Sequence, residues 1–148
     1  MRTAVSRQNV EVPGGKLWVE VRGQGSPLVL LHDGLLPSET WDEQVAVFAR
    51  SFRVVRYDRR GYGRSAPSQG PYSDVEDLAA VLAAQKIDSA VLMGCSNGSK
   101  LAVDFALAHP DQVEGLVLVG PVVSGMPYSE HMLRGGLVNY RPMFREKS

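Results

Sequence analysis

The sequence has few of the residues that build disulfides and metal sites. Its 148 residues include one cysteine, Cys95, and three histidines. A single cysteine cannot form a disulfide within the chain, and we expect Cys95 to be a small buried hydrophobic residue rather than a reactive thiol. Because the histidines are scattered, they do not have the spacing of metal ligands. The sequence therefore predicts no metal site and no cofactor.

An excess of charge and long apolar runs are also missing. Sixteen basic residues balance sixteen acidic ones, and no basic stripe is present, which argues against a nucleic-acid partner. No apolar run reaches the length of a membrane span or of a signal-peptide core, so we expect no membrane association. A hydrophobic content of 44% is ordinary for a globular domain. These features together predict a cytoplasmic chain with one folded core.

Hydrophobic periodicity predicts an initial hairpin followed by alternating strands and helices. An uninterrupted apolar run at Leu28–Leu31 is typical of a central strand that is covered on both faces. Ser38 is in the position of an N-cap, and Ser73–Glu76 has the spacing of a capping box. The expected strands lie at residues 9–12, 16–22, 28–31, 52–57, 90–93 and 113–119, and the expected helices at about 39–50, 73–85 and 97–109.

This order predicts an α/β fold, in which an antiparallel hairpin leads into a mostly parallel sheet of about six strands flanked by helices. Functional residues in such sheets gather at the carboxyl ends of the strands. Three of these ends carry polar residues here, in the stretches His32–Gly34, Asp58–Arg60 and Gly94–Ser96. The arginines at positions 56, 59, 60 and 64 could bind an anion, but a solvated or salt-bridged loop is the favoured interpretation.

The sequence around Ser96 has the spacing of a nucleophile elbow. Gly94, Ser96 and Gly98 form a Gly-x-Ser-x-Gly pattern between a predicted strand and a predicted helix. Such a turn is so tight that the residues two before and two after the serine must be small. The serine would then project at the amino end of the helix, where the amide of Asn97 and the helix dipole can stabilise an oxyanion.

Several motifs in this order resemble the alpha/beta-hydrolase fold family. They are His32–Gly34 after a buried strand, Asp58–Ser65 (DRRGYGRS) after the next strand, Gly94–Gly98 at the elbow, and Ala108–Val119 at the following helix-to-strand step. The resemblance covers roughly residues 10–123. It implies a partial hydrolase core at residues 1–123, with residues 124–148 as an irregular tail or the start of a lid.

The resemblance implies a role for each matching residue. Ser96 corresponds to the nucleophile, and the backbone amides of Asn97 and Gly34 correspond to the two oxyanion donors. His32 corresponds to a structural histidine that anchors the turn, rather than to the catalytic base. Asp33 stands where the family commonly has glycine. A carboxylate there would repel an oxyanion unless it turned away, so local backbone bonding is favoured over a catalytic role.

The acid and the general-base histidine of the family follow the serine in the chain. Only His109 and His131 follow Ser96 here. His109 would lie at the far end of the helix, about 18 Å away at 1.5 Å per residue, and His131 lies where a lid would begin. The resemblance thus implies that the acid, the histidine and the final strands are missing from this sequence. The last predicted strand would then be an open edge through which chains could associate.

Three functions remain open on these grounds. The first is a serine hydrolase, an esterase or lactonase, that acts on small ester-like substrates through an acyl-enzyme at Ser96. The second is a truncated, catalytically silent chain that binds a partner or persists as a fragment. The third is a different reaction on the same fold, such as that of a lyase or a haloperoxidase.

Overall fold

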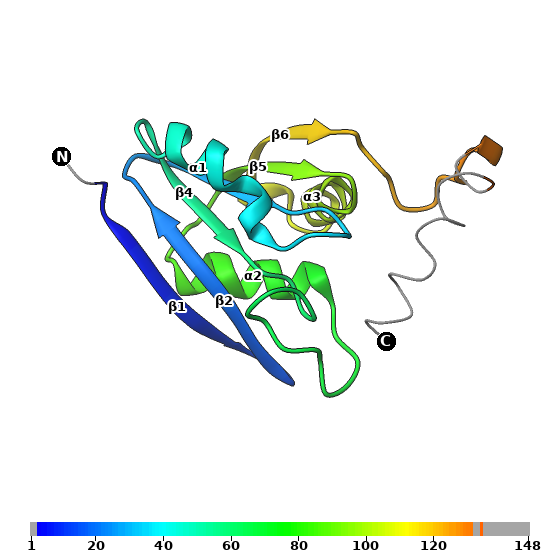
Figure 1. Ribbon diagram of the computed structural model, residues 1–148, viewed down its shortest axis with the longest axis horizontal. Coiled ribbons are helices and arrows are strands. Elements are labelled where there is room, and N and C mark those ends of the chain that lie inside the picture. Colours follow the sequence, from blue (N-terminus) through cyan, green and yellow to red (C-terminus); the bar gives the residue numbers. More distant parts are fainter. Residues whose placement is uncertain (1–2, 132–133, 135–148) are drawn as a thin grey trace.

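The structure is a computed structural model that describes residues 3–131 and 134. Its centre is a six-stranded sheet with the strand order β1-β2-β4-β3-β5-β6 (Figure 1). β2 pairs antiparallel with β1 and with β4, whereas β3, β4, β5 and β6 are parallel to one another. The predicted fold class is therefore confirmed. The strands are β1 (Val5–Val12), β2 (Gly15–Arg22), β3 (Ser26–Leu31), β4 (Phe52–Tyr57), β5 (Ala90–Cys95) and β6 (Val113–Val119).

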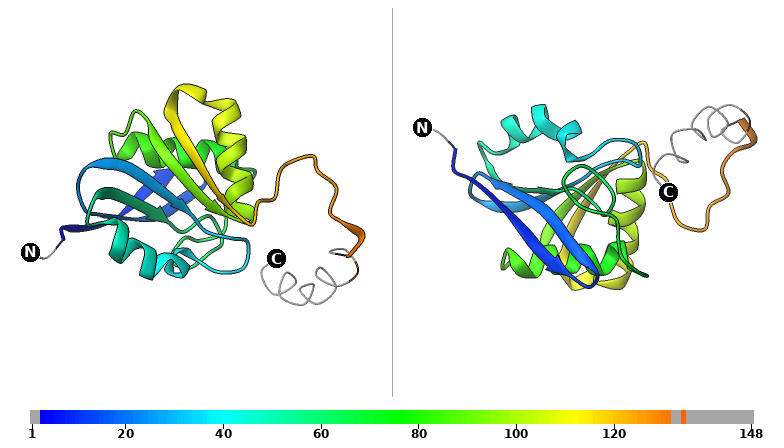
Figure 2. Two further views of the ribbon diagram at one scale, coloured as in Figure 1. Left: turned by 90° about the horizontal axis from the view of Figure 1, so that it is seen from above. Right: turned by 60° about the horizontal axis from the view of Figure 1, so that its bottom comes forward.

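Helices cover both faces of the sheet, because each parallel connection has to cross over one face. Helix α1 lies on one face, and α2 and α3 lie together on the other (Figure 2). Short 3-10 segments, η1 and η2, precede α1 and β6. The bounds are η1 (Ser38–Trp41), α1 (Asp42–Phe48), α2 (Asp74–Ala84), α3 (Asn97–Ala108) and η2 (Pro110–Gln112).

The hydrophobic core has two parts, one on each face of the sheet. On the larger side, Leu78, Leu82 and Phe105 of α2 and α3 pack against the strands and are fully buried. On the other side, Trp41 and Val45 pack against the opposite strand faces. Residues of β3 belong to both parts of the core, so this strand is covered on both faces as expected.

Two local predictions need correction. The first strand begins at Val5 rather than at residue 9, because its polar, exposed residues pair along the whole length of β2. Ser38 is not an N-cap: the cap position belongs to Pro37, and no side chain caps that end. Ser38 instead donates its hydroxyl to Asp58 Oδ1 at 2.6 Å inside the fold. By contrast Ser73 does cap α2, since its hydroxyl accepts the backbone N–H of Glu76.

Strand β6 forms one edge of the sheet in the described part of the chain. Three of its apolar side chains, Leu116, Val117 and Val119, are more than a third exposed. After β6, residues 120–129 have no regular secondary structure and run away from the sheet (Figure 1). Glu130 and His131 have helical backbone.

Candidate active site

The turn between β5 and α3 has the tight geometry that the Gly-x-Ser-x-Gly pattern predicts. Ser96 adopts φ 51° and ψ −114°, a conformation that side-chain-bearing residues rarely take. A β-carbon on Gly94 would lie 2.4 Å from the backbone of Gly98, and one on Gly98 would lie 2.1 Å from the carbonyl oxygen of Leu31. Both positions therefore require glycine for steric reasons. The strained Ser96 backbone is held by its surroundings.

Two hydrogen bonds hold this turn in place. The Ser96 N–H donates to the carbonyl of Val119 at the end of β6, at 3.0 Å. The hydroxyl of Ser99, which is fully buried in the first turn of α3, donates to the carbonyl of Gly94 at 2.8 Å. Sequence reasoning gave Ser99 no role, and its position three residues after Ser96 is the only signal that could have suggested one.

The turn after β3 is held from within by Asp33. Its Oδ1 atom accepts the backbone N–H groups of Leu35 at 2.6 Å and of Leu36 at 2.8 Å. This is the local backbone bonding that was favoured for Asp33. The carboxylate thus stabilises the loop that carries Gly34.

His32 is fully buried and makes a hydrogen bond with each ring nitrogen. Its Nδ1 atom lies 2.7 Å from the carbonyl oxygen of Asp33, and its Nε2 atom accepts the backbone N–H of Arg59 at 3.0 Å. Burial, assisted by the positive charge of Arg59, lowers the pKa of His32 to about 4. The imidazole is therefore neutral near pH 7, with Nδ1 as the donor. With both nitrogens bonded to backbone, His32 joins the turn after β3 to the loop after β4.

The loop after β4 also binds the turn. Arg59 Nη2 donates to the carbonyl oxygens of His32 at 3.0 Å and of Asp33 at 2.7 Å. The hydroxyl of Tyr62 donates to the carbonyl of Gly34 at 2.9 Å, and its ring packs edge-on against His32. Three consecutive carbonyls of the turn are thus held from one side. These contacts of Arg59 and Tyr62 have no signal in the sequence beyond the loop motif in which both residues lie.

The structure brings the two proposed oxyanion donors close together. Gly34 faces Asn97, since a β-carbon on Gly34 would lie 2.4 Å from Asn97 Nδ2. Asn97 is the first residue of α3, so its N–H has no acceptor within the helix. Over residues 3–131 and 134, no acceptor hydrogen-bonds the Gly34 N–H either. The N–H of Asn97, the residue after Ser96, and the N–H of Gly34, which lies against the Asn97 side chain, are thus both unpaired.

Charged residues in the loop after β4 are mostly paired. Asp58 is fully buried and accepts both the N–H and the hydroxyl of Ser38. Arg56 pairs with Glu20, and Arg60 pairs with Asp77. Arg56 and Arg60 therefore form salt bridges within the fold, which is the interpretation that was favoured over anion binding.

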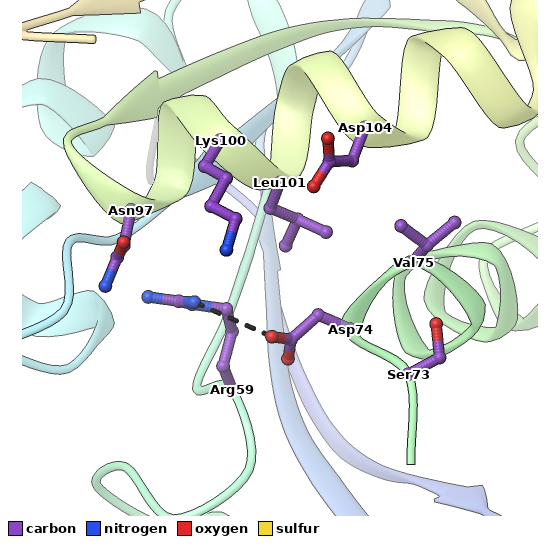
Figure 3. Close-up of a pocket in the computed structure, with 8 residues that line it drawn as sticks. All are labelled: Arg59, Ser73, Asp74, Val75, Asn97, Lys100, Leu101 and Asp104. Atoms are coloured by element: carbon purple, nitrogen blue, oxygen red, sulfur yellow. Dashed lines mark ion pairs between the residues drawn. The ribbon is translucent and has the colours of Figure 1, made fainter. Parts of the chain in front are cut away.

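A cavity of about 300 Å³ opens between the amino ends of α2 and α3. Figure 3 shows Lys100 and Asn97 extending from α3 toward Arg59, while Asp74 faces Arg59 from α2. Burial raises the pKa of Asp74, and the charge of Arg59 partly offsets that effect. Ser96 does not line this cavity, so Asn97 alone links it to the elbow.

Cys95, next to the candidate nucleophile, is partly buried. Burial and the nearby charge of Asp33 raise the pKa of the thiol. The thiol form is therefore favoured near pH 7, which agrees with the expectation that Cys95 is not a reactive group.

In the part of the chain that the structure describes, no histidine nitrogen hydrogen-bonds the Ser96 hydroxyl. His109 follows the last residue of α3 and lies 3.6 Å from a carboxylate oxygen of Glu76. His131 is exposed beyond β6. Among these same residues, no three histidine, cysteine or acidic side chains are grouped so that they could hold a metal ion.

The pairing of the strands and the strained turn at Ser96 are those of folds that carry a nucleophile elbow. A sequence profile of the alpha/beta hydrolase fold matches residues 27–147. The chain therefore belongs to the alpha/beta hydrolase fold family.

Individual relatives agree with this assignment. The chain is 37% identical to a pimeloyl-[acyl-carrier protein] methyl ester esterase of Vibrio atlanticus over 103 residues, which cover 70% of this chain and 39% of the esterase. A solved structure of Est816, titled as an N-acyl homoserine lactone degrading enzyme, is 31% identical with a TM-score of 0.77. It matches 94% of this chain and 56% of its own. Esterase RhEst1 from Rhodococcus is 37% identical with a TM-score of 0.71, over 80% and 46% of the two chains.

The chain spans about half, or less, of the length of these relatives. Their similarity therefore supports the family and leaves substrate and activity as matters for proposal. No helix over residues 3–131 combines the length and the apolar character needed to cross a membrane.

Proposed function

We propose that this chain is the nucleophile-bearing part of a serine hydrolase that acts on small esters or lactones. The observation that carries the proposal is the strained backbone of Ser96 beside the unpaired amides of Gly34 and Asn97. Unpaired N–H groups that are fixed before the reaction are the usual means of stabilising a tetrahedral oxyanion. Relatives named as an ester esterase and as a lactone-degrading enzyme agree with this substrate class.

In the proposed reaction, the Ser96 hydroxyl oxygen attacks the carbonyl carbon of the substrate, and a base takes the hydroxyl proton. The carbonyl oxygen becomes negative and accepts hydrogen bonds from Gly34 and Asn97. The C–O bond to the leaving group then breaks, the leaving oxygen takes up the proton, and an acyl-enzyme remains. Attack by water releases the acid and restores Ser96.

Neither His32 nor His109 can be the base, because His32 uses both nitrogens within the fold and His109 is at the opposite end of α3. The same observation favours the second candidate function, a chain in which the elbow remains as architecture without catalysis. A serine with no base is a weak nucleophile, although oxyanion donors alone retain some rate enhancement.

Reaction with a fluorophosphonate probe, followed by intact-mass analysis, separates the two candidates. The wild-type chain and two variants, Ser96→Ala and Ser89→Ala, are treated side by side, and circular dichroism establishes that each is folded. A single adduct on the wild type and on Ser89→Ala, absent from Ser96→Ala, supports the hydrolase. A folded wild-type chain that gains no adduct supports the silent chain.

A further inference from the structure

Arg59 differs from the arginines around it in what its guanidinium binds. Arg60 pairs closely with a carboxylate, whereas Arg59 directs Nη2 at the carbonyl oxygens of His32 and Asp33. The nearest carboxylate oxygen to Arg59, on Asp74, is 4.0 Å away. Arg59 is only 7% exposed, so its charge acts in surroundings that screen it weakly. This buried charge is therefore directed mainly at the backbone of one turn.

The carbonyl oxygen of Asp33 is held by two donors at once. His32 Nδ1 and Arg59 Nη2 each lie 2.7 Å from it. No cis peptide bond occurs in the described residues, so the Gly34 N–H points in the direction opposite to this carbonyl. Two donors on the Asp33 oxygen thus fix the direction of the Gly34 N–H, away from Arg59.

A hydrogen bond from a guanidinium also polarises the peptide that accepts it. The charge draws electron density toward the Asp33 carbonyl oxygen, which makes the N–H at the other end of the same peptide a stronger donor. That N–H belongs to Gly34 and has no acceptor among residues 3–131 and 134. Its donor capacity is therefore free for a ligand.

We infer that Arg59 is a positioning residue that orients and polarises the Asp33–Gly34 peptide, so that the Gly34 N–H is ready for the substrate oxyanion. The inference rests on the proposed function, in which Gly34 is one of the two oxyanion donors. His32 assists as the second donor to the same carbonyl. Its neutral form suits this role, because Nδ1 then donates while Nε2 accepts the Arg59 N–H.

The orientation can be measured without any reaction. Residual dipolar couplings of the N–H bonds in the full chain report the direction of the Gly34 N–H relative to the sheet. We expect the wild-type coupling to fit the structure, and the Gly34 coupling in Arg59→Met to depart from it or to average toward zero. Arg60→Met is the matched control, since it removes a buried arginine from the same loop without touching the turn.

The effect on reactivity is read from the rate of fluorophosphonate labelling at Ser96. Loss of an oxyanion donor lowers enzyme rates by about 10²–10³, so a donor that is merely misaligned should lower the labelling rate by roughly 10-fold or more in Arg59→Met. Added guanidinium ion should restore part of the rate to Arg59→Ala, because the vacated space adjoins the cavity that Arg59 lines. Arg60→Ala should be labelled at about the wild-type rate both with and without the ion.

Each outcome decides the inference. An unchanged Gly34 coupling in folded Arg59→Met overturns it, and so does an equal rate loss in Arg59→Met and Arg60→Met. If Arg59→Met does not fold, Arg59→Lys replaces it. We expect a smaller change in the Gly34 coupling and in the labelling rate, because the lysine ammonium keeps the charge but lacks the planar set of donors of a guanidinium. If wild-type Ser96 is not labelled, the proposed function fails for this chain, and the dipolar couplings alone decide whether Arg59 orients the peptide.

Discussion

Gly98 packs so closely on Leu31 that a β-carbon at position 98 would lie 2.1 Å from the Leu31 carbonyl oxygen. This contact joins the first turn of α3 to the end of the central strand, where neither backbone can move far. We expect Gly98→Ala to lower the free energy of unfolding by about 3 kcal/mol or more, since overpacking against backbone is poorly relieved. Urea denaturation followed by circular dichroism measures the loss.

Gly70→Ala is the control for that substitution. No atom lies within 4 Å of a β-carbon built on Gly70, so its free energy of unfolding should change by less than about 0.5 kcal/mol. Equal urea midpoints for the two variants would show that the elbow tolerates a methyl group and that its geometry is looser than described.

Arg60 and Asp77 form a buried ion pair with two hydrogen bonds, of 2.7 and 2.8 Å, between the loop after β4 and helix α2. We expect Asp77→Asn to lower the free energy of unfolding by about 3–5 kcal/mol, because the Arg60 charge would remain buried without its partner. Thermal and urea unfolding measure the change.

The exposed pair between Glu11 and Lys16 serves as the comparison. Removing that pair by Glu11→Gln should cost no more than about 1 kcal/mol, because both side chains are solvated. A loss for Asp77→Asn as small as that of Glu11→Gln would contradict the strong coupling assigned to the buried pair.

The elbow could be predicted because its requirements are local. A β-carbon on Gly94 would collide with the backbone of Gly98 within the same turn, and the strand and helix beside the turn have clear apolar patterns. The close contact of Gly98 with Leu31 is the part of the elbow that is not local. The hairpin, the buried central strand and the cap at Ser73 are likewise encoded within short stretches, and the structure has them where expected.

The contacts that hold the Asp33–Gly34 peptide could not be predicted in the same way. Arg59 and His32 are 27 residues apart in sequence, and nothing near either residue indicates which carbonyl the guanidinium binds. Ser38 was assigned to a helix cap because its neighbours fit that role, yet the buried carboxylate of Asp58 is a better acceptor for its hydroxyl. Such contacts depend on how the loops meet at the sheet edge, which no local pattern specifies.

The neutral His32 should make stability depend on pH. Its pKa is lowered from 6.5 to about 4 in the folded chain, so the unfolded chain binds a proton first as the pH falls. The neutral imidazole contributes to the free energy of unfolding, and this contribution is fully present above pH 6.5. It is lost as the pH falls toward 4, so the free energy of unfolding is lower by about 2 kcal/mol at pH 5.

His32→Gln removes the titrating group and isolates the effect. Although the variant should be less stable at every pH, its urea midpoint should fall less than that of the wild type between pH 7 and pH 5. If the urea midpoints of the two chains fell in parallel with pH, protonation of His32 would not destabilise the fold. That result would contradict the buried, doubly hydrogen-bonded position of His32.

Strand β6 is an edge of the sheet among residues 3–131, and we expect this edge to cause chains to associate. Leu116, Val117 and Val119 are exposed there, and an edge strand with apolar side chains is a template for pairing with a second copy. We expect sedimentation velocity to show dimers or larger species that grow with concentration. Val117→Lys should shift the chain toward monomer, because a lysine at an edge strand opposes pairing. Leu107→Lys, on the exposed side of α3, should leave association unchanged. A wild-type chain that stays monomeric at its highest attainable concentration would show that the β6 edge is not adhesive by itself.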